Sequence, residues 1–181
     1  MSHLPIWYLS NISHEVCDKL VSEFSLLPSR DATIGVDGAQ LLHSVRDTTV
    51  RFVPKDHSFE GTLKGVALEG NTVCKWDYHV TSNAAIQFAE YGVNQHYHWH
   101  ADTFTLAGGP TERKLTVVCL LNDPSEFEGG NFEVRLYNDY LAPLTKGSVI
   151  AFPSILEHRV TPILSGVRYS ATMWLSGPRF R

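Results

Sequence analysis

The chain has 181 residues, 43% of them hydrophobic and 19% charged, which is ordinary for a globular protein that buries one sizeable core. Its formal charge of −4 at pH 7, without any cluster of Lys and Arg, argues against nucleic acid as a ligand. Because we find neither a signal-peptide pattern nor an apolar run of membrane-spanning length, we expect a soluble, cytoplasmic single domain over residues 1–181, with its oligomeric state left open.

Two helices are expected in the first 72 residues. Ser13 can cap the first helix, which should end near Pro28, and the second should stop at residues 70–71. Apolar residues recur at helical spacing in both. These residues are Cys17, Leu20, Val21 and Phe24 in the first helix, and Phe59, Leu63, Val66 and Ala67 in the second.

From about residue 73 onward, short runs with β character replace the helical pattern. Expected strands cover residues 76–80, 85–91, 115–121, 131–137, 148–152 and 167–175. Glycine- and proline-containing turns separate most of them. Helices followed by many short strands predict a mainly β fold, a barrel or sandwich with the helices packed on one outer face.

The three cysteines, Cys17, Cys74 and Cys119, are far apart in the sequence and odd in number. This pattern predicts neither a disulfide framework nor a zinc knuckle. We expect all three to be buried as small apolar residues.

A dense group of histidines marks the first candidate site, at residues 95–102. His100 and Asp102 are two positions apart, so on extended backbone both side chains project to the same side and can share a metal ion. Taken alone, this short motif is more often part of a solvated, histidine-rich loop than of a metal site.

A third ligand candidate lies beyond a later apolar strand. His158 follows residues 149–152 at a point where a barrel can return it beside His100 and Asp102. Two imidazoles and one carboxylate form the facial triad of non-haem iron(II) sites, which leaves coordination positions open. A structural zinc site would more often have four ligands, rich in thiolate.

Arg168 begins a run in which polar residues alternate with apolar ones, and residues 162–166 can turn the chain back before it. If Arg168 points inward, period two places Ser170, Thr172 and Trp174 on the same face. Such a face is typical of a pocket wall, and a buried guanidinium there would bind a carboxylate. The alternative turns Arg168 to solvent and the intervening apolar residues to the core.

Several motifs together resemble the prolyl 4-hydroxylase-like branch of the iron and 2-oxoglutarate dioxygenases, over most of the chain. The motifs are residues 91–102, Arg113-Lys114-Leu115-Thr116, Leu120-Leu121-Asn122, Glu128-Gly129-Gly130-Asn131-Phe132, residues 146–154, residues 158–162 and Gly166-Val167-Arg168. Residues 152–174 are especially similar to the smaller microbial hydroxylases called PKHD-type.

The resemblance implies a double-stranded β-helix (jelly-roll, cupin-like) with N-terminal helices, about 1–72, packed on one sheet of a barrel, about 73–181. It implies Fe(II) held by His100, Asp102 and His158, and 2-oxoglutarate anchored by Arg168. The resemblance also points to further residues that line the cosubstrate or substrate pocket. They are Tyr91, Tyr97 and Phe132, each of which could equally be a core aromatic. Thr172, on the inward face that begins at Arg168, is a further candidate for the cosubstrate site.

One departure from the family pattern affects the expected cosubstrate site. Several relatives have a tyrosine at the position of Leu120, where its hydroxyl helps to hold the distal carboxylate, and leucine cannot donate that hydrogen bond. Thr116 or Thr172 is the substitute that we expect.

The activity implied by the resemblance is oxidative decarboxylation of 2-oxoglutarate by O2, coupled to hydroxylation of a C–H bond. A prolyl residue in a peptide or protein is the expected substrate, selected by loops around residues 30–51 and 103–111, and ascorbate stimulation is a further expectation. Alternatives are a free amino acid or small metabolite as substrate, a non-catalytic metal-binding sensor, and a cupin-like enzyme that needs no oxoacid.

Overall fold

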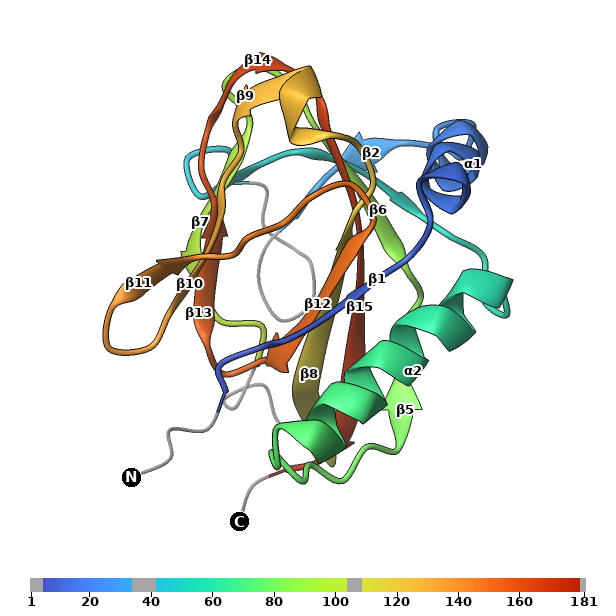
Figure 1. Ribbon diagram of the computed structural model, residues 1–181, viewed down its shortest axis with the longest axis vertical. Coiled ribbons are helices and arrows are strands. Elements are labelled where there is room, and N and C mark those ends of the chain that lie inside the picture. The colour runs from blue at the N-terminus through green and yellow to red at the C-terminus, as the bar shows by residue number, and fades with distance from the viewer. Residues whose placement is uncertain (1–4, 34–41, 104–108, 180–181) are drawn as a thin grey trace.

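Two antiparallel sheets face each other, and two helices cover the outer side of the larger sheet (Figure 1). The structure is a computed structural model that describes residues 5–33, 42–103 and 109–179. The mainly β architecture with helices on one outer face agrees with the sequence prediction.

The larger sheet has the strand order β1-β12-β8-β15-β6-β4-β2, and β5 pairs with β15. Its strands are β1 (Tyr8–Asn11), β2 (Arg30–Asp31), β4 (Thr49–Phe52), β5 (Ser82–Asn83), β6 (Gln87–Tyr91), β8 (Thr111–Leu120), β12 (Ser148–Pro153) and β15 (Arg168–Pro178). The longest strands, β8 and β15, pair along nearly their whole length at the centre of the sheet. This central pair contributes to one wall of the pocket described below.

The smaller sheet has the order β11-β10-β13-β7-β3. Its strands are β3 (Arg46–Asp47), β7 (His96–His100), β10 (Phe132–Arg135), β11 (Asp139–Leu141) and β13 (Glu157–Val160). A separate two-stranded sheet joins β9 (Phe127–Gly129) to β14 (Ile163–Gly166), next to the short 3-10 helix Pro124–Glu126.

Both helices begin at side-chain caps. Ser13 accepts a hydrogen bond from the backbone of α1 (His14–Phe24), as expected. The ring of His57 caps α2 (Ser58–Val73) through Nδ1, and its Nε2 lies 3.1 Å from Glu23 of α1. At its other end, α2 continues to Val73, beyond the end that was expected at residues 70–71.

The larger sheet separates two hydrophobic cores. One core lies between the sheet and the helices, and the other lies between the two sheets. Strand β8 contributes side chains to both cores, because Val117 and Cys119 face the helices while Val118 faces the smaller sheet. The three cysteines are buried and unbridged, which confirms the sequence prediction.

Three expectations on the elements are wrong. Residues 76–80 form no strand, because Lys75 and Asp77 adopt left-handed backbone (φ 56° and 53°), although Trp76 still packs on the helix-side core. The first 72 residues are not purely helical, since they also contain β1 to β4. Residues 162–166 are not a simple turn, because Ile163–Gly166 is the strand β14.

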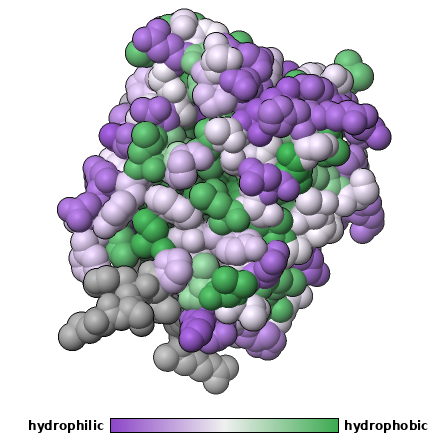
Figure 2. Space-filling view, in the orientation of Figure 1, coloured by the Kyte–Doolittle hydropathy of each residue, from purple (hydrophilic) through white to green (hydrophobic). Residues whose placement is uncertain are grey.

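Hydrophilic side chains gather over α1 at the upper right of the face in Figure 2, as expected for an amphipathic helix with one side in solvent. Within the described residues, no helix combines the length and the apolar character that crossing a membrane requires.

Candidate metal centre and pocket

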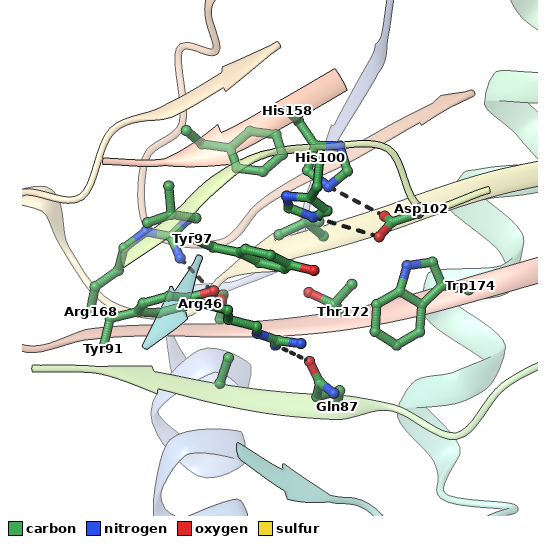
Figure 3. Close-up of a pocket in the computed structure, with 15 residues that line it drawn as sticks. Arg46, Gln87, Tyr91, Tyr97, His100, Asp102, His158, Arg168, Thr172 and Trp174 are labelled. Carbon is green, nitrogen blue, oxygen red and sulfur yellow. Dashed lines mark hydrogen bonds and ion pairs between the residues drawn. The ribbon is translucent and has the colours of Figure 1, made fainter. Parts of the chain in front are cut away.

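A pocket opens between the two sheets, and the candidate residues from the sequence converge on it (Figure 3). Strands β6 and β15 of the larger sheet form one wall. Strands β7, β10 and β13 of the smaller sheet form the facing wall, and β3 adds Arg46.

The three expected metal ligands lie together in this pocket. His158 on β13 is directly opposite His100 on β7, and Asp102 follows β7. Nε2 of His100 is 3.6 Å from one carboxylate oxygen of Asp102, and Nε2 of His158 is 3.3 Å from the other. Because the three ligand atoms lie within 4.8 Å of one another, they could hold one metal ion.

The hydrogen bonds of the two imidazoles prepare them as ligands. Nδ1 of His100 lies 2.7 Å from the His98 carbonyl, and Nδ1 of His158 lies 3.1 Å from the Leu156 carbonyl. Since a carbonyl only accepts, each Nδ1 carries the hydrogen, and each Nε2 presents its lone pair to the shared space. Burial lowers the pKa of His100 to about 3, so this ring stays neutral near pH 7.

Asp102 is held as a buried anion. Burial alone would raise its pKa, but His158, His100 and Arg113 together hold the pKa below its ordinary value. Thr116 donates a hydrogen bond of 2.8 Å to one carboxylate oxygen and lies 2.9 Å from the hydroxyl of Ser154. The carboxylate is therefore both charged and fixed in direction.

A β-bulge sets which side chains of β7 reach the pocket. His158 pairs with His100 but Val160 pairs with Tyr97, so β7 has one residue more than β13 between these two pairs. Tyr97 and His100 consequently face the same side and stack, with ring centroids 3.4 Å apart. Burial raises the pKa of Tyr97 to about 12, so its hydroxyl stays protonated.

Arg168 lies at the other end of the pocket from Trp174 and is only 1% exposed. Its Nη1 donates to the Ser170 hydroxyl over 3.0 Å, whereas its Nη2 has no partner. Burial lowers the pKa of Arg168, yet a guanidinium keeps its charge in proteins. The inward orientation is thus the correct one of the two considered for this strand, and Ser170, Thr172 and Trp174 line the same pocket.

The remaining predicted pocket residues also lie here. Tyr91 pairs with Arg168 across β6 and β15, Phe132 lies 5.7 Å from the His158 ring, and Thr172 lines the pocket. Leu120 lines a separate cavity behind Arg168. Thr116 is committed to Asp102, so it is not positioned to replace the missing tyrosine.

Sequence reasoning missed two polar residues of the pocket lining, Arg46 and Gln87. Arg46 is 7% exposed, lies 4.5 Å above the Tyr97 ring, and donates to the Gln87 side chain over 2.6 Å. The sequence could have identified Gln87 as a candidate, because it is a polar residue within an otherwise apolar strand pattern. Arg46 gave no such indication, because it sits among other charged residues of a region expected to be a loop.

Of the loops expected to select the substrate, residues 34–41 and 104–108 lie outside the described residues.

Comparison with known families gives a match over residues 86–176, to the model described as the 2OG-Fe(II) oxygenase superfamily. This region contains His100, Asp102, His158 and Arg168.

Among curated relatives, a PKHD-type hydroxylase of Xylella fastidiosa (strain 9a5c) is 26% identical over 155 residues, covering 79% of this chain and 65% of that protein. A PKHD-type hydroxylase of Thermosynechococcus vestitus is 35% identical over 92 residues, covering 49% and 41%. The chain therefore spans less than two thirds of the length of these relatives.

Among solved structures, a prolyl-4-hydroxylase of Pseudomonas putida matches with a TM-score of 0.69 at 17% identity, covering 97% of this chain and 94% of that one. A viral collagen prolyl hydroxylase of Paramecium Bursaria Chlorella virus-1, in complex with 2OG, also has a TM-score of 0.69, at 19% identity over 96% and 97%. These neighbours have the double-stranded β-helix fold, which confirms the expected fold class.

Proposed function

Because the chain belongs to the 2OG-Fe(II) oxygenase superfamily, we propose that it is an iron(II)- and 2-oxoglutarate-dependent hydroxylase that works in the pocket between its sheets. One observation carries the proposal. His100, Asp102 and His158 converge in the same pocket as a buried arginine that has an unpaired donor, Arg168.

The donor set fits ferrous iron. Two neutral imidazole nitrogens and one carboxylate are the ligands of the facial triad, and three protein ligands leave positions open for small ligands. Hydrogen bonds orient all three ligands. Backbone carbonyls accept from His100 and His158, and the hydroxyl of Thr116 donates to Asp102.

Arg168 is the proposed anchor for the distal carboxylate of 2-oxoglutarate. Its Nη2 donor has no partner in the protein, and a carboxylate is the group that a guanidinium binds best. We assign to Ser170 the hydrogen bond that a tyrosine at the position of Leu120 would donate. Its oxygen accepts from Arg168, and its hydrogen has no acceptor among the described residues. Tyr91, beside Arg168, lines the same end of the pocket.

When bound, iron and 2-oxoglutarate supply the oxidising chemistry, in which O2 converts the oxoacid to succinate and carbon dioxide and hydroxylates a C–H bond of the substrate. The protein side chains bind, orient and exclude water. Tyr97 stacks on His100, while Phe132 and Phe152 pack around the His158 ring and keep solvent away from it. Stimulation by ascorbate stays a prediction.

A prolyl residue in a peptide or protein is the proposed substrate. Support comes from the prolyl hydroxylases among the structural neighbours, one of which is a Trichoplax adhaerens enzyme in complex with a hypoxia inducible factor peptide fragment. This part rests on likeness of fold, because the identities are below 25%.

The proposal is tested by anaerobic titration of the iron(II)-loaded protein with 2-oxoglutarate, followed through the weak visible charge-transfer band of the chelate. We expect the band in the wild type and its loss in His158→Ala. A surface histidine variant, His43→Ala, serves as the matched control and should keep the band.

Absence of the band from wild-type protein that demonstrably holds iron would overturn the 2-oxoglutarate assignment. That result would favour a cupin-like enzyme that uses no oxoacid, or a metal-binding module. If the band forms, succinate release with peptide substrates is the next measurement.

A further inference from the structure

The pocket contains a second buried arginine that the proposed handling of iron and 2-oxoglutarate does not use. Arg46 comes from the edge strand β3, and its guanidinium reaches across to Gln87 on β6 of the facing sheet. It is 7% exposed, so its charge is largely removed from water. Burying a guanidinium is costly unless an anion compensates it.

No carboxylate compensates Arg46 among the described residues. Its partners there are neutral, namely the amide oxygen of Gln87 at 2.6 Å and the ring of Tyr97 at 4.5 Å. Its Nε is buried and has no hydrogen-bond partner, and the same is true of the indole Nε1 of Trp174 in the same pocket. Both are donors, so these two N–H groups lack an acceptor in the part of the chain that the structure describes.

The distal carboxylate of 2-oxoglutarate cannot fill this gap if Arg168 holds it. Along the paired strands, Arg168 is opposite Tyr91 and Thr172 is opposite Gln87. Four residues of strand separate these two positions, roughly 13 Å at 3.3 Å per residue. In Figure 3 the head group of Arg46 points toward Gln87, away from the end that holds Arg168.

Charge balance leads to the same conclusion. The cationic side chains lining the pocket are Arg46 and Arg168, and the only carboxylate among the described lining residues is Asp102, which also faces Arg113 at 3.9 Å. Ferrous iron and the 2-oxoglutarate dianion carry opposite and equal charges, so loading both leaves the excess positive charge in place. A neutral substrate would leave it uncompensated.

We propose that the substrate presents a carboxylate to Arg46, close to the carbon that is hydroxylated. The inference rests on the proposed function and narrows its substrate class. Arg46 stacks on Tyr97, which stacks on His100, so one aromatic ring separates the cation from the metal centre. The carboxylate can be that of a free or C-terminal amino acid, or that of an acidic side chain next to an internal prolyl residue.

The test compares acids with their amides on the anaerobic iron(II)–2-oxoglutarate protein, with the visible chelate band as a readout that needs no turnover. The pairs are acetate and acetamide, L-proline and L-prolinamide, a peptide with C-terminal proline as acid and amide, and an internal prolyl peptide followed by Asp or Asn. The last three pairs distinguish the sources of the carboxylate.

We expect the acids to perturb the band at concentrations about tenfold lower than their amides in the wild type. Gln87→Glu supplies Arg46 with an internal carboxylate, so this preference should disappear. Asn138→Asp adds the same charge at an exposed position and should retain the preference. Thermal unfolding of both variants checks that they are folded.

Equal potency of acids and amides in the wild type would overturn the inference, as would a band that no acid perturbs or a preference that survives Gln87→Glu. These outcomes are distinct from failure of the proposed function, in which the band itself does not form with 2-oxoglutarate.

Discussion

Arg168 is a buried cation whose second terminal nitrogen has no partner in the protein. If it binds the distal carboxylate, Arg168→Ala should raise the KM for 2-oxoglutarate about a hundredfold, equivalent to roughly 3 kcal/mol for a buried charge-assisted pair. The measurement is 2-oxoglutarate consumption against its concentration. Arg30→Ala, at an exposed position, is the control and should keep the wild-type KM. An unchanged KM in Arg168→Ala would contradict the assignment of the distal carboxylate to Arg168.

Thr116 contacts the proposed metal site only through Asp102. Thr116→Val preserves the shape of a fully buried residue but removes the hydrogen bond to the carboxylate. We expect metal affinity to fall by about 10- to 100-fold, as is usual when the partner of a ligand is lost. Cobalt(II) titration, followed by absorption, measures this affinity. Thr72→Val on the exposed side of α2 is the matched control, and equal affinities in both variants would contradict the prediction.

At the scale of single residues, the sequence predicted the side chains that repeat with a strand period. Arg168, Ser170, Thr172 and Trp174 share one face because β15 is regular there. The sequence could not predict the hydrogen bond between Arg46 and Gln87, because this contact joins two sheets and depends on how the sheets pack. The same limit applies to Thr116, whose role follows from its distance to Asp102.

The bulge in β7 shows why the sequence alone did not predict which side chains of this strand face the pocket. Strict alternation would send Tyr97 and His100 to opposite faces, yet both line the pocket because one extra residue is accommodated between them. Trp99 is directed outward instead, where it lies 3.9 Å from Arg135 and 4.7 Å from Arg159. Bulges depend on the partner strand, so the sequence of β7 alone does not reveal one.

The turn after β9 connects backbone conformation to the pocket. Gly130 has φ +59°, and a Cβ there would lie 2.5 Å from a terminal methyl of Ile163 and 3.0 Å from Cδ of Arg168. Gly130→Ala should therefore displace Arg168 and raise the KM for 2-oxoglutarate, with a loss of about 1–2 kcal/mol in the free energy of unfolding. Enzyme kinetics and urea denaturation measure the two effects.

Gly129→Ala is the matched comparison for that prediction. Its added Cβ would meet the backbone oxygen of Pro162 at 2.1 Å, which cannot move without the chain. We expect the larger loss of stability in this variant. A Gly130→Ala protein with normal 2-oxoglutarate affinity would show that Arg168 is not held by this turn.

At the scale of the whole molecule, the larger sheet separates a stabilising core from a core that also forms the pocket. Leu63 of α2 is fully buried on the helix side. Leu63→Ala should lower the free energy of unfolding by about 2–5 kcal/mol while the affinity of the folded protein for 2-oxoglutarate stays unchanged. Urea denaturation and titration of the chelate band measure these two quantities. A large change in affinity would indicate that the two faces are coupled.

The order of elements made the overall fold predictable, since two helices followed by many short strands leave few architectures. The short strands in the first 72 residues were not predictable, because each has four residues or fewer and pairs with a strand far along the chain or with another short one. Such short strands form because the completed sheet offers them a partner strand. Their own residues therefore show little strand pattern.

The unpaired donors of Arg46 and Arg168 also bear on the stability of the ligand-free protein. Desolvated charges without counter-ions favour opening of the chain, and a ligand that binds only the folded form opposes it. Digestion by proteases of the transiently opened protein depends on that balance. If 2-oxoglutarate and an anionic substrate bind these two arginines as proposed, both ligands should slow proteolysis of the protein as well as take part in turnover.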